Sequence, residues 1–116
     1  MVERISLESL KKIMHGKVSE PSTCLIKFYS NKCHYCHALK PMYESLSESY
    51  EDLHFFVFNI SDDKQKEVYP VEGVPTICLV RTGPKTSIKQ LPEPPEPDAG
   101  TWYTLPHIRK FINKEK

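Results

Sequence analysis

The chain has 116 residues, of which 39% are hydrophobic and 27% are charged, and its formal net charge is +1. This length suits a single domain, 1–116, and the balanced charge gives no electrostatic basis for binding nucleic acid or an anionic membrane. No apolar run approaches the roughly 20 residues that a membrane-spanning helix needs. The first ten residues contain no apolar signal core, so the sequence predicts a cytoplasmic location.

The first half of the chain alternates helix and strand patterns. Residues 7–14 repeat apolar side chains at helical spacing, and 2–5 could form a short strand before them. Residues 24–29 form an apolar run without alternation, which is typical of a central strand covered on both faces. A helix that contains Pro41 follows, and 54–60 form a second apolar strand. Because a helix joins these two strands, they are expected to be parallel.

The second half predicts a short polar helix, a hairpin and a final helix. These elements are expected at residues 61–69, at 77–80 with 87–91, and at 104–112. The tight turn at Gly83 and Pro84 makes the two hairpin strands antiparallel. The element order therefore predicts an α/β fold, with a mixed central sheet of four to five strands flanked by helices on both faces.

Residues 92–100 form the one compositionally biased segment and hold four of the ten prolines. Such a segment is expected to be an extended surface loop, here joining the hairpin to the last helix. Trp102 and Tyr103 are expected to anchor this loop or the helix that follows it. The P-x-x-P spacing also fits a ligand for proline-binding domains, although the segment lacks a flanking basic anchor.

Two of the four cysteines, Cys33 and Cys36, stand two residues apart between a predicted strand and a predicted helix. The helix dipole and unpaired backbone N–H groups at that end stabilise a thiolate on Cys33, which is the attacking species in disulfide exchange. Cys36 is close enough to resolve a mixed disulfide. The spacing therefore predicts a thiol–disulfide oxidoreductase. Cys24 and Cys78 fall on predicted strands and are expected to be buried, reduced core residues.

Other interpretations of the same motif remain open at this point. The run Cys33-His34-Tyr35-Cys36-His37 fits C-x-x-C-H, the attachment motif of c-type haem in electron carriers. A zinc site is a second alternative, but it needs four ligands and the sequence has no second close pair of cysteines. A third is a non-catalytic binding module in which the cysteines are incidental.

Several further motifs accompany the cysteine pair between residues 24 and 91. They are an aromatic strand end at Phe28-Tyr29, a helix proline at Pro41, a strand end at Asn59-Ile60, the tripeptide Val74-Pro75-Thr76 and a hairpin turn at Gly83. Together they resemble the thioredoxin superfamily, and 36–43 resembles the catalytic domains of protein disulfide isomerases in particular. The resemblance implies a thioredoxin-like fold.

The resemblance also implies how the site works. Cys33 and Cys36 would be catalytic, and Pro75 would be a cis-proline that packs against the disulfide and helps to exclude metal. Val74, Pro75 and Thr76 would bind an extended substrate peptide in the manner of an added strand. The partners implied are protein thiols or disulfides, with a reductase or glutathione as the electron source. Neither an organic cofactor nor a metal is expected, and we expect a monomer.

The sequence departs from the family around this pair. Lys32 replaces the usual tryptophan before the first cysteine, and Val57 replaces a lysine on the next strand. His34 and Tyr35 form an unusual central dipeptide. Both are expected to tune the site, since a protonated imidazole at His34 would favour the Cys33 thiolate and make the couple more oxidising.

Lys27 is the sharpest departure, because it stands where the family has a buried acid. A desolvated Lys27 with a lowered pKa could serve as a neutral base. Alternatively, its stem could reach water at the edge of the sheet and keep its charge, which would stabilise the thiolate. We favour the second arrangement on the sequence alone, since a buried charge without a partner is costly.

Overall fold

The computed structural model describes residues 1–63 and 73–116. The described strands form one sheet in the order β1-β3-β2-β4-β5. They are β1 (Val2–Arg4), β2 (Ser22–Tyr29), β3 (His54–Asn59), β4 (Thr76–Thr82) and β5 (Ser87–Gln90). The helices are α1 (Leu7–Met14), α2 (His34–Ser49) and α3 (Leu105–Glu115), with a short 3₁₀ helix η1 (Ile60–Asp62). Strand β3 is parallel to both β1 and β2, whereas β4 is antiparallel to β2 and β5.

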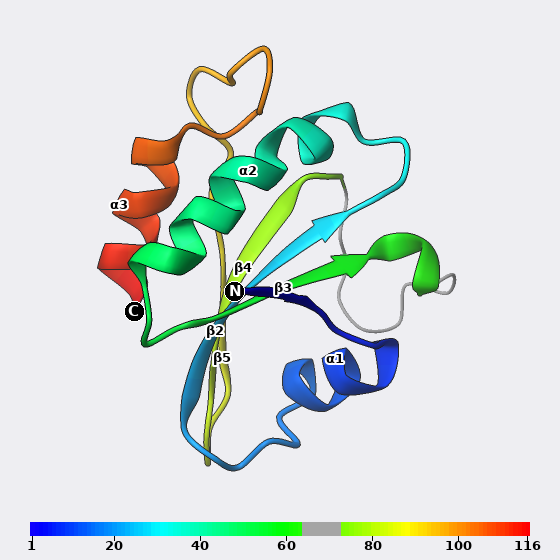
Figure 1. The fold of residues 1–116 in the computed structure, drawn as a ribbon. Helices are drawn as coiled ribbons and strands as arrows, with labels where there is room; N and C mark the ends of the chain where they lie inside the picture. The colour runs from blue at the N-terminus through cyan, green and yellow to red at the C-terminus, as the bar shows by residue number, and fades with distance from the viewer. Residues whose placement is uncertain (64–72) are drawn as a thin grey trace.

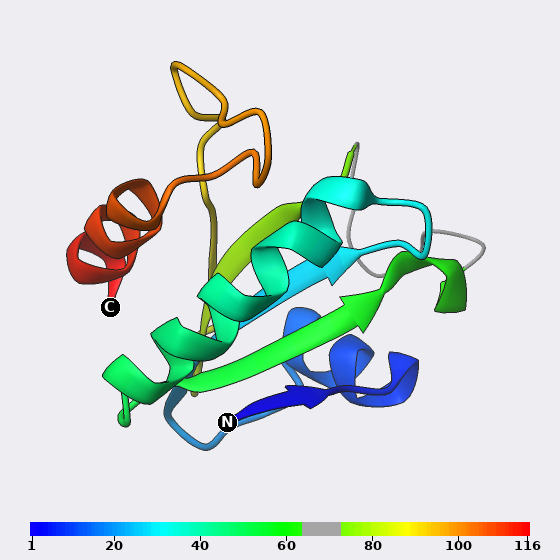
Figure 2. The same cartoon turned by 45° about the horizontal axis from the view of Figure 1, so that its top comes forward.

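Helices cover both faces of the sheet, as Figures 1 and 2 show: α1 lies on one face, and α2 and α3 lie on the other. The side chains of β2 alternate between these layers. Ile26 and Phe28 belong to the hydrophobic cluster that contains α1 residues, and Leu25 belongs to the cluster under α2 and α3. The absence of alternation in the sequence of β2 therefore reflects a central strand buried on both sides, as predicted.

The predicted α/β fold is confirmed, including the mixed sheet and the antiparallel hairpin of β4 and β5. The short N-terminal strand is present as β1, so the sheet has five strands. The polar helix expected at 61–69 falls mostly outside the described residues. No helix in the described ranges is both long enough and apolar enough to span a bilayer.

The parallel pairing of β2 and β3 brings the ends of both strands to one edge of the sheet. Tyr29, the last residue of β2, lies opposite Asn59, the last residue of β3. Thr76, the first residue of β4, lies opposite Phe28. The loop that leads into α2 and the loop that leads into β4 therefore meet at the same edge.

Candidate functional site

Cys33 and Cys36 form a disulfide at the start of α2, with their Cα atoms 5.2 Å apart. Cys33 is the N-cap residue of this helix, and its Sγ accepts a hydrogen bond from the Cys36 backbone N–H at 3.1 Å. Cys33 is 8% exposed and Cys36 is 2% exposed. The first cysteine is thus the more accessible of the two. Hydrogen bonding to a charged sulfur favours the thiolate, so this amide stabilises Cys33 in the reduced protein.

The turn before Cys33 is held from two sides. The Asn59 side chain donates a hydrogen bond to Asn31 Oδ1 at 2.9 Å, and His37 Nε2 donates to the Asn31 carbonyl at 3.0 Å. The Cys33 N–H also donates to the Ser30 carbonyl at 3.2 Å. The sequence analysis did not single out Asn31. Its role depends on strand pairing that places Asn59 beside it, which no local pattern reveals.

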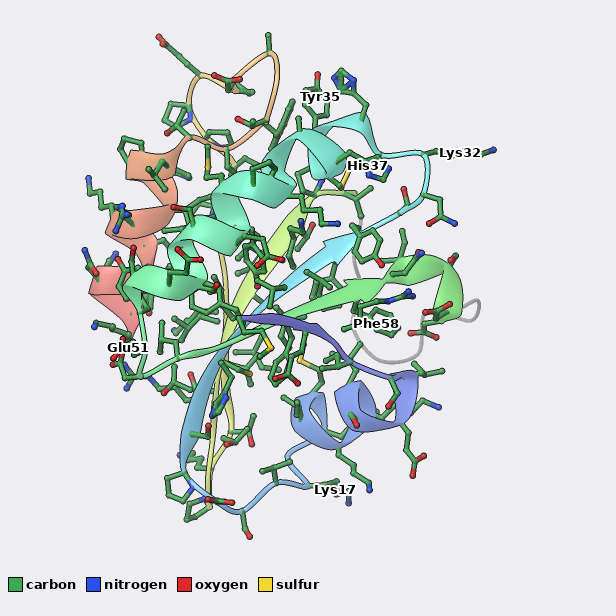
Figure 3. The ribbon with its side chains drawn as sticks, in the orientation of Figure 1. Lys17, Lys32, Tyr35, His37, Glu51 and Phe58 are labelled. Carbon is green, nitrogen blue, oxygen red and sulfur yellow. A yellow bond between two sulfur atoms is a disulfide. The ribbon has the colours of Figure 1, made fainter. Side chains whose placement is uncertain are left out.

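His34 and Tyr35 lie between the cysteines, as predicted, and their rings contact each other edge to face at 4.7 Å between centroids. His34 is exposed and Tyr35 is half-buried. The Tyr35 ring also packs against Trp102, with centroids 5.5 Å apart. Figure 3 shows Tyr35 and His37 at the start of α2, whereas Lys32 points away from the molecule. The sequence analysis missed the contact with Trp102.

The segment Val74-Pro75-Thr76 enters β4 at the same edge of the sheet. Its Val74–Pro75 peptide bond is cis. Pro75 and Thr76 are buried and Val74 is half-buried. The Thr76 hydroxyl donates a hydrogen bond to the Gly73 carbonyl at 2.6 Å, and the Tyr103 hydroxyl donates to the Pro75 carbonyl at 3.3 Å. The structure thus gathers the predicted substrate-binding residues at the edge of the sheet that carries the disulfide.

Lys27 does not reach water at the edge of the sheet, and our expectation that it would is wrong. Its side chain is 4% exposed, and Nζ lies 5.1 Å from the centroid of the Tyr43 ring. The reason is its strand: β2 has a neighbour on each side, and α2 covers the face onto which Lys27 projects. Burial, reinforced by the charge of Lys40 and opposed by that of Glu44, lowers the pKa of Lys27 from 10.5 to about 8.

Lys27 and Cys36 line the same cavity, which has a volume of about 410 Å³. Val57 also lines this cavity and lies opposite Lys27 in the strand register, so the next strand supplies no charged partner at this position. The other lining residues are Val2, Arg4, Tyr29, His37, Lys40, Tyr43 and Glu44. The cavity therefore carries several basic groups and one carboxylate beside the buried cysteine of the pair.

Cys24 and Cys78 are buried and remain as thiols. Both belong to the hydrophobic cluster under α1, on the opposite face of the sheet from α2. Burial raises the pKa of Cys24 to about 11. A thiol with a raised pKa holds little thiolate at neutral pH, so neither geometry nor charge prepares Cys24 for exchange.

We therefore predict that Cys24 and Cys78 resist labelling in the native oxidised protein. N-ethylmaleimide should leave the intact mass unchanged under conditions in which the unfolded oxidised protein gains two adducts. Rapid addition of a single adduct to the native protein would show an accessible thiol and would contradict the structural role assigned to these two residues.

The described ranges, 1–63 and 73–116, contain no group of three or more His, Cys, Asp or Glu side chains arranged to hold a metal ion. His37, the candidate ligand next to the motif, instead donates a hydrogen bond to the backbone of Asn31.

The sequence was compared with protein-family models and with known proteins. A protein-family model described as thioredoxin matches residues 7–95. Human protein disulfide-isomerase A4 is 33% identical over 94 residues, covering 78% of this chain and 14% of that protein. Thioredoxin from Borreliella burgdorferi is 35% identical over 74 residues, covering 60% of this chain and 62% of that protein.

The fold also matches solved structures. The crystal structure of thioredoxin from Malassezia sympodialis superimposes with a TM-score of 0.67 at 16% identity, covering 97% of this chain and 91% of that one. A chain from the complex of ferredoxin:thioredoxin reductase with thioredoxin f2 superimposes with a TM-score of 0.70, also at 16% identity, covering 97% of this chain and 93% of that one. The chain spans only 14–17% of the length of the disulfide-isomerase relatives that it matches.

Proposed function

The chain belongs to the thioredoxin family, and on that basis we propose that it is a thiol–disulfide oxidoreductase acting on protein substrates through Cys33 and Cys36. The observation that carries this proposal is the Cys33–Cys36 disulfide at the start of α2. The Cys36 N–H donates to Cys33 Sγ there, which prepares the more exposed cysteine for attack as a thiolate.

In the reducing direction, the Cys33 thiolate attacks one sulfur of a substrate disulfide. A mixed disulfide forms, and the other substrate sulfur leaves as a thiolate that takes up a proton. Cys36 then loses its proton and attacks Cys33 Sγ. This second step restores the Cys33–Cys36 disulfide and releases the remaining substrate thiolate. Two electrons pass from the dithiol of this chain to the substrate, and the reverse sequence oxidises a substrate dithiol.

The cavity beside Cys36 gives the second step a path for its proton. Lys27 lines this cavity, and its pKa of about 8 allows it to exchange a proton near neutral pH. While protonated, the same amine stabilises a thiolate on Cys36. We assign Lys27 to this tuning role, and His34 to stabilisation of the Cys33 thiolate from the solvent side.

The segment Val74-Pro75-Thr76 is the proposed binding edge for an extended substrate chain. Its position beside the end of β2 supports this assignment. A reductase or glutathione would return electrons to the disulfide. An external source is needed because Cys24 and Cys78, the other two cysteines, are buried on the opposite face of the sheet. The cytoplasmic location and the monomeric state stay predictions.

Catalysed reduction of insulin by dithiothreitol tests the proposal. The rate should rise in proportion to the concentration of this protein above the rate with dithiothreitol alone. The matched control is the same protein reduced and alkylated with iodoacetamide while folded, which blocks Cys33, the most exposed of the four cysteines. Equal rates with the two samples would contradict the proposal and favour a non-catalytic binding module.

A further inference from the structure

The proline-rich loop is an ordered structure that ends beside the redox pair. Asp98 and Trp102 exchange two backbone hydrogen bonds, each of 3.0 Å. The Asp98 carboxylate accepts hydrogen bonds from the N–H groups of Gly100 at 2.7 Å and Thr101 at 3.1 Å. These bonds close residues 98–102 into a tight turn, and the conformation of Trp102 is therefore set by its own backbone.

Trp102 has a backbone φ of 67°, in the left-handed region that favours glycine. It is the one non-glycine residue with positive φ in the part of the chain that the structure describes. A bulky residue is rare in this conformation because its Cβ crowds the backbone, and such strain gathers at functional sites. Glycine or asparagine would fit this turn with less strain. A tryptophan at this position therefore suggests that the turn serves to place the indole.

The indole is fixed at both ends. Its Nε1–H donates a hydrogen bond to the Glu93 carboxylate at 2.7 Å, and its ring packs on Tyr35 with centroids 5.5 Å apart. The next residue, Tyr103, is fully buried and donates a hydrogen bond to the Pro75 carbonyl. Consecutive residues of the loop thus join the helix turn that holds the cysteines to the segment before β4. Figure 3 shows Tyr35 projecting beside this loop.

Trp102 and Tyr35 are both half-buried, and Tyr35 lies in the first turn of the helix that Cys33 caps. We propose that Trp102 is a substrate-positioning residue: together with Tyr35 it forms an aromatic surface that receives an aromatic or large apolar side chain adjacent to the substrate cysteine. This inference rests on the proposed function and specifies the class of protein disulfide that the site prefers.

The test compares two symmetric peptide disulfides that differ only in having phenylalanine or serine beside each cysteine. We expect the reduced wild-type protein to reduce the phenylalanine peptide with a kcat/KM about tenfold higher, as one aromatic contact allows. Trp102→Ala should reduce that ratio to about one. Trp102→Phe should restore part of the preference, and Glu96→Gln, an exposed change on the same loop, should leave it intact.

Hydroxyethyl disulfide serves as a small substrate with no side chain to place. Its rate should change less than twofold in Trp102→Ala, whereas a general disturbance of the site would slow all three substrates together. If Trp102→Ala does not fold, Glu93→Ala removes the acceptor of the indole N–H while keeping Trp102, and it should lower the peptide ratio in the same direction. A wild-type ratio near one, or a ratio unchanged in these variants, would overturn the inference. Failure of the wild type on all three substrates would instead overturn the proposed function.

Discussion

Replacing Lys27 with methionine is expected to stabilise the oxidised protein at pH 7 by about 2 kcal/mol. Lys27 is buried and its pKa is lowered from 10.5 to about 8, so folding disfavours its charged form. A shift of that size corresponds to roughly 3 kcal/mol, and attraction between the ammonium and the Tyr43 ring offsets about 1 kcal/mol of it. Methionine fills a similar volume and removes the buried charge.

The sign of the pH dependence follows from the direction of the shift. The folded state binds fewer protons at Lys27 than the unfolded state between the folded and unfolded pKa values. The destabilisation is therefore present below pH 8 and disappears as the pH rises towards 10.5. Wild type should gain about 2 kcal/mol relative to Lys27→Met between pH 7 and pH 9.5.

Urea unfolding of the oxidised proteins at the two pH values measures this difference, because the disulfide keeps Cys33 and Cys36 from titrating. Lys32→Met is the matched control, since Lys32 is exposed and points away from the molecule. Its stability should stay within about 0.5 kcal/mol of wild type at both pH values. A less stable Lys27→Met protein whose difference from wild type does not change with pH would show that folding leaves the pKa of Lys27 unshifted, and would contradict this account.

The sequence predicted those features that short-range patterns control. The unbroken apolar run of β2 identified a central strand, and the C-x-x-C spacing before a helix identified the redox pair. The fate of Lys27 was predicted wrongly because it depends on which neighbours flank β2 and on the helix above it. A stem of four carbons reaches water from an edge strand but not from the middle of this sheet.

Contacts between distant segments were the other features beyond the reach of the sequence. Trp102 was correctly expected to anchor the loop, and its indole N–H donates a hydrogen bond to Glu93. Its packing on Tyr35 joins residues 67 positions apart in the chain and follows from a strained turn that composition does not signal. The contact of Asn59 with Asn31 likewise exists only because β2 and β3 end together.

The second large effect concerns the different roles of the two cysteines, Cys33 as the attacking residue and Cys36 as the resolving residue. Cys33→Ser should abolish turnover of a peptide disulfide, because it removes the thiol of the more exposed cysteine, whose sulfur accepts a hydrogen bond from the Cys36 N–H. Cys36→Ser should also abolish multiple turnover, but for a different reason. Cys33 can still attack, and without a second thiolate the mixed disulfide has no route to resolution within the protein. Only the second variant should therefore accumulate a covalent adduct.

Mass spectrometry of the Cys36→Ser protein after incubation with a peptide disulfide tests the assignment of Cys33 most directly. One peptide should be attached per chain, and proteolysis should locate it on Cys33, with no adduct formed in the matched Cys33→Ser protein. An adduct located on Cys24 or Cys78, or equal adduct formation in the two variants, would contradict the assignment of Cys33 as the attacking sulfur.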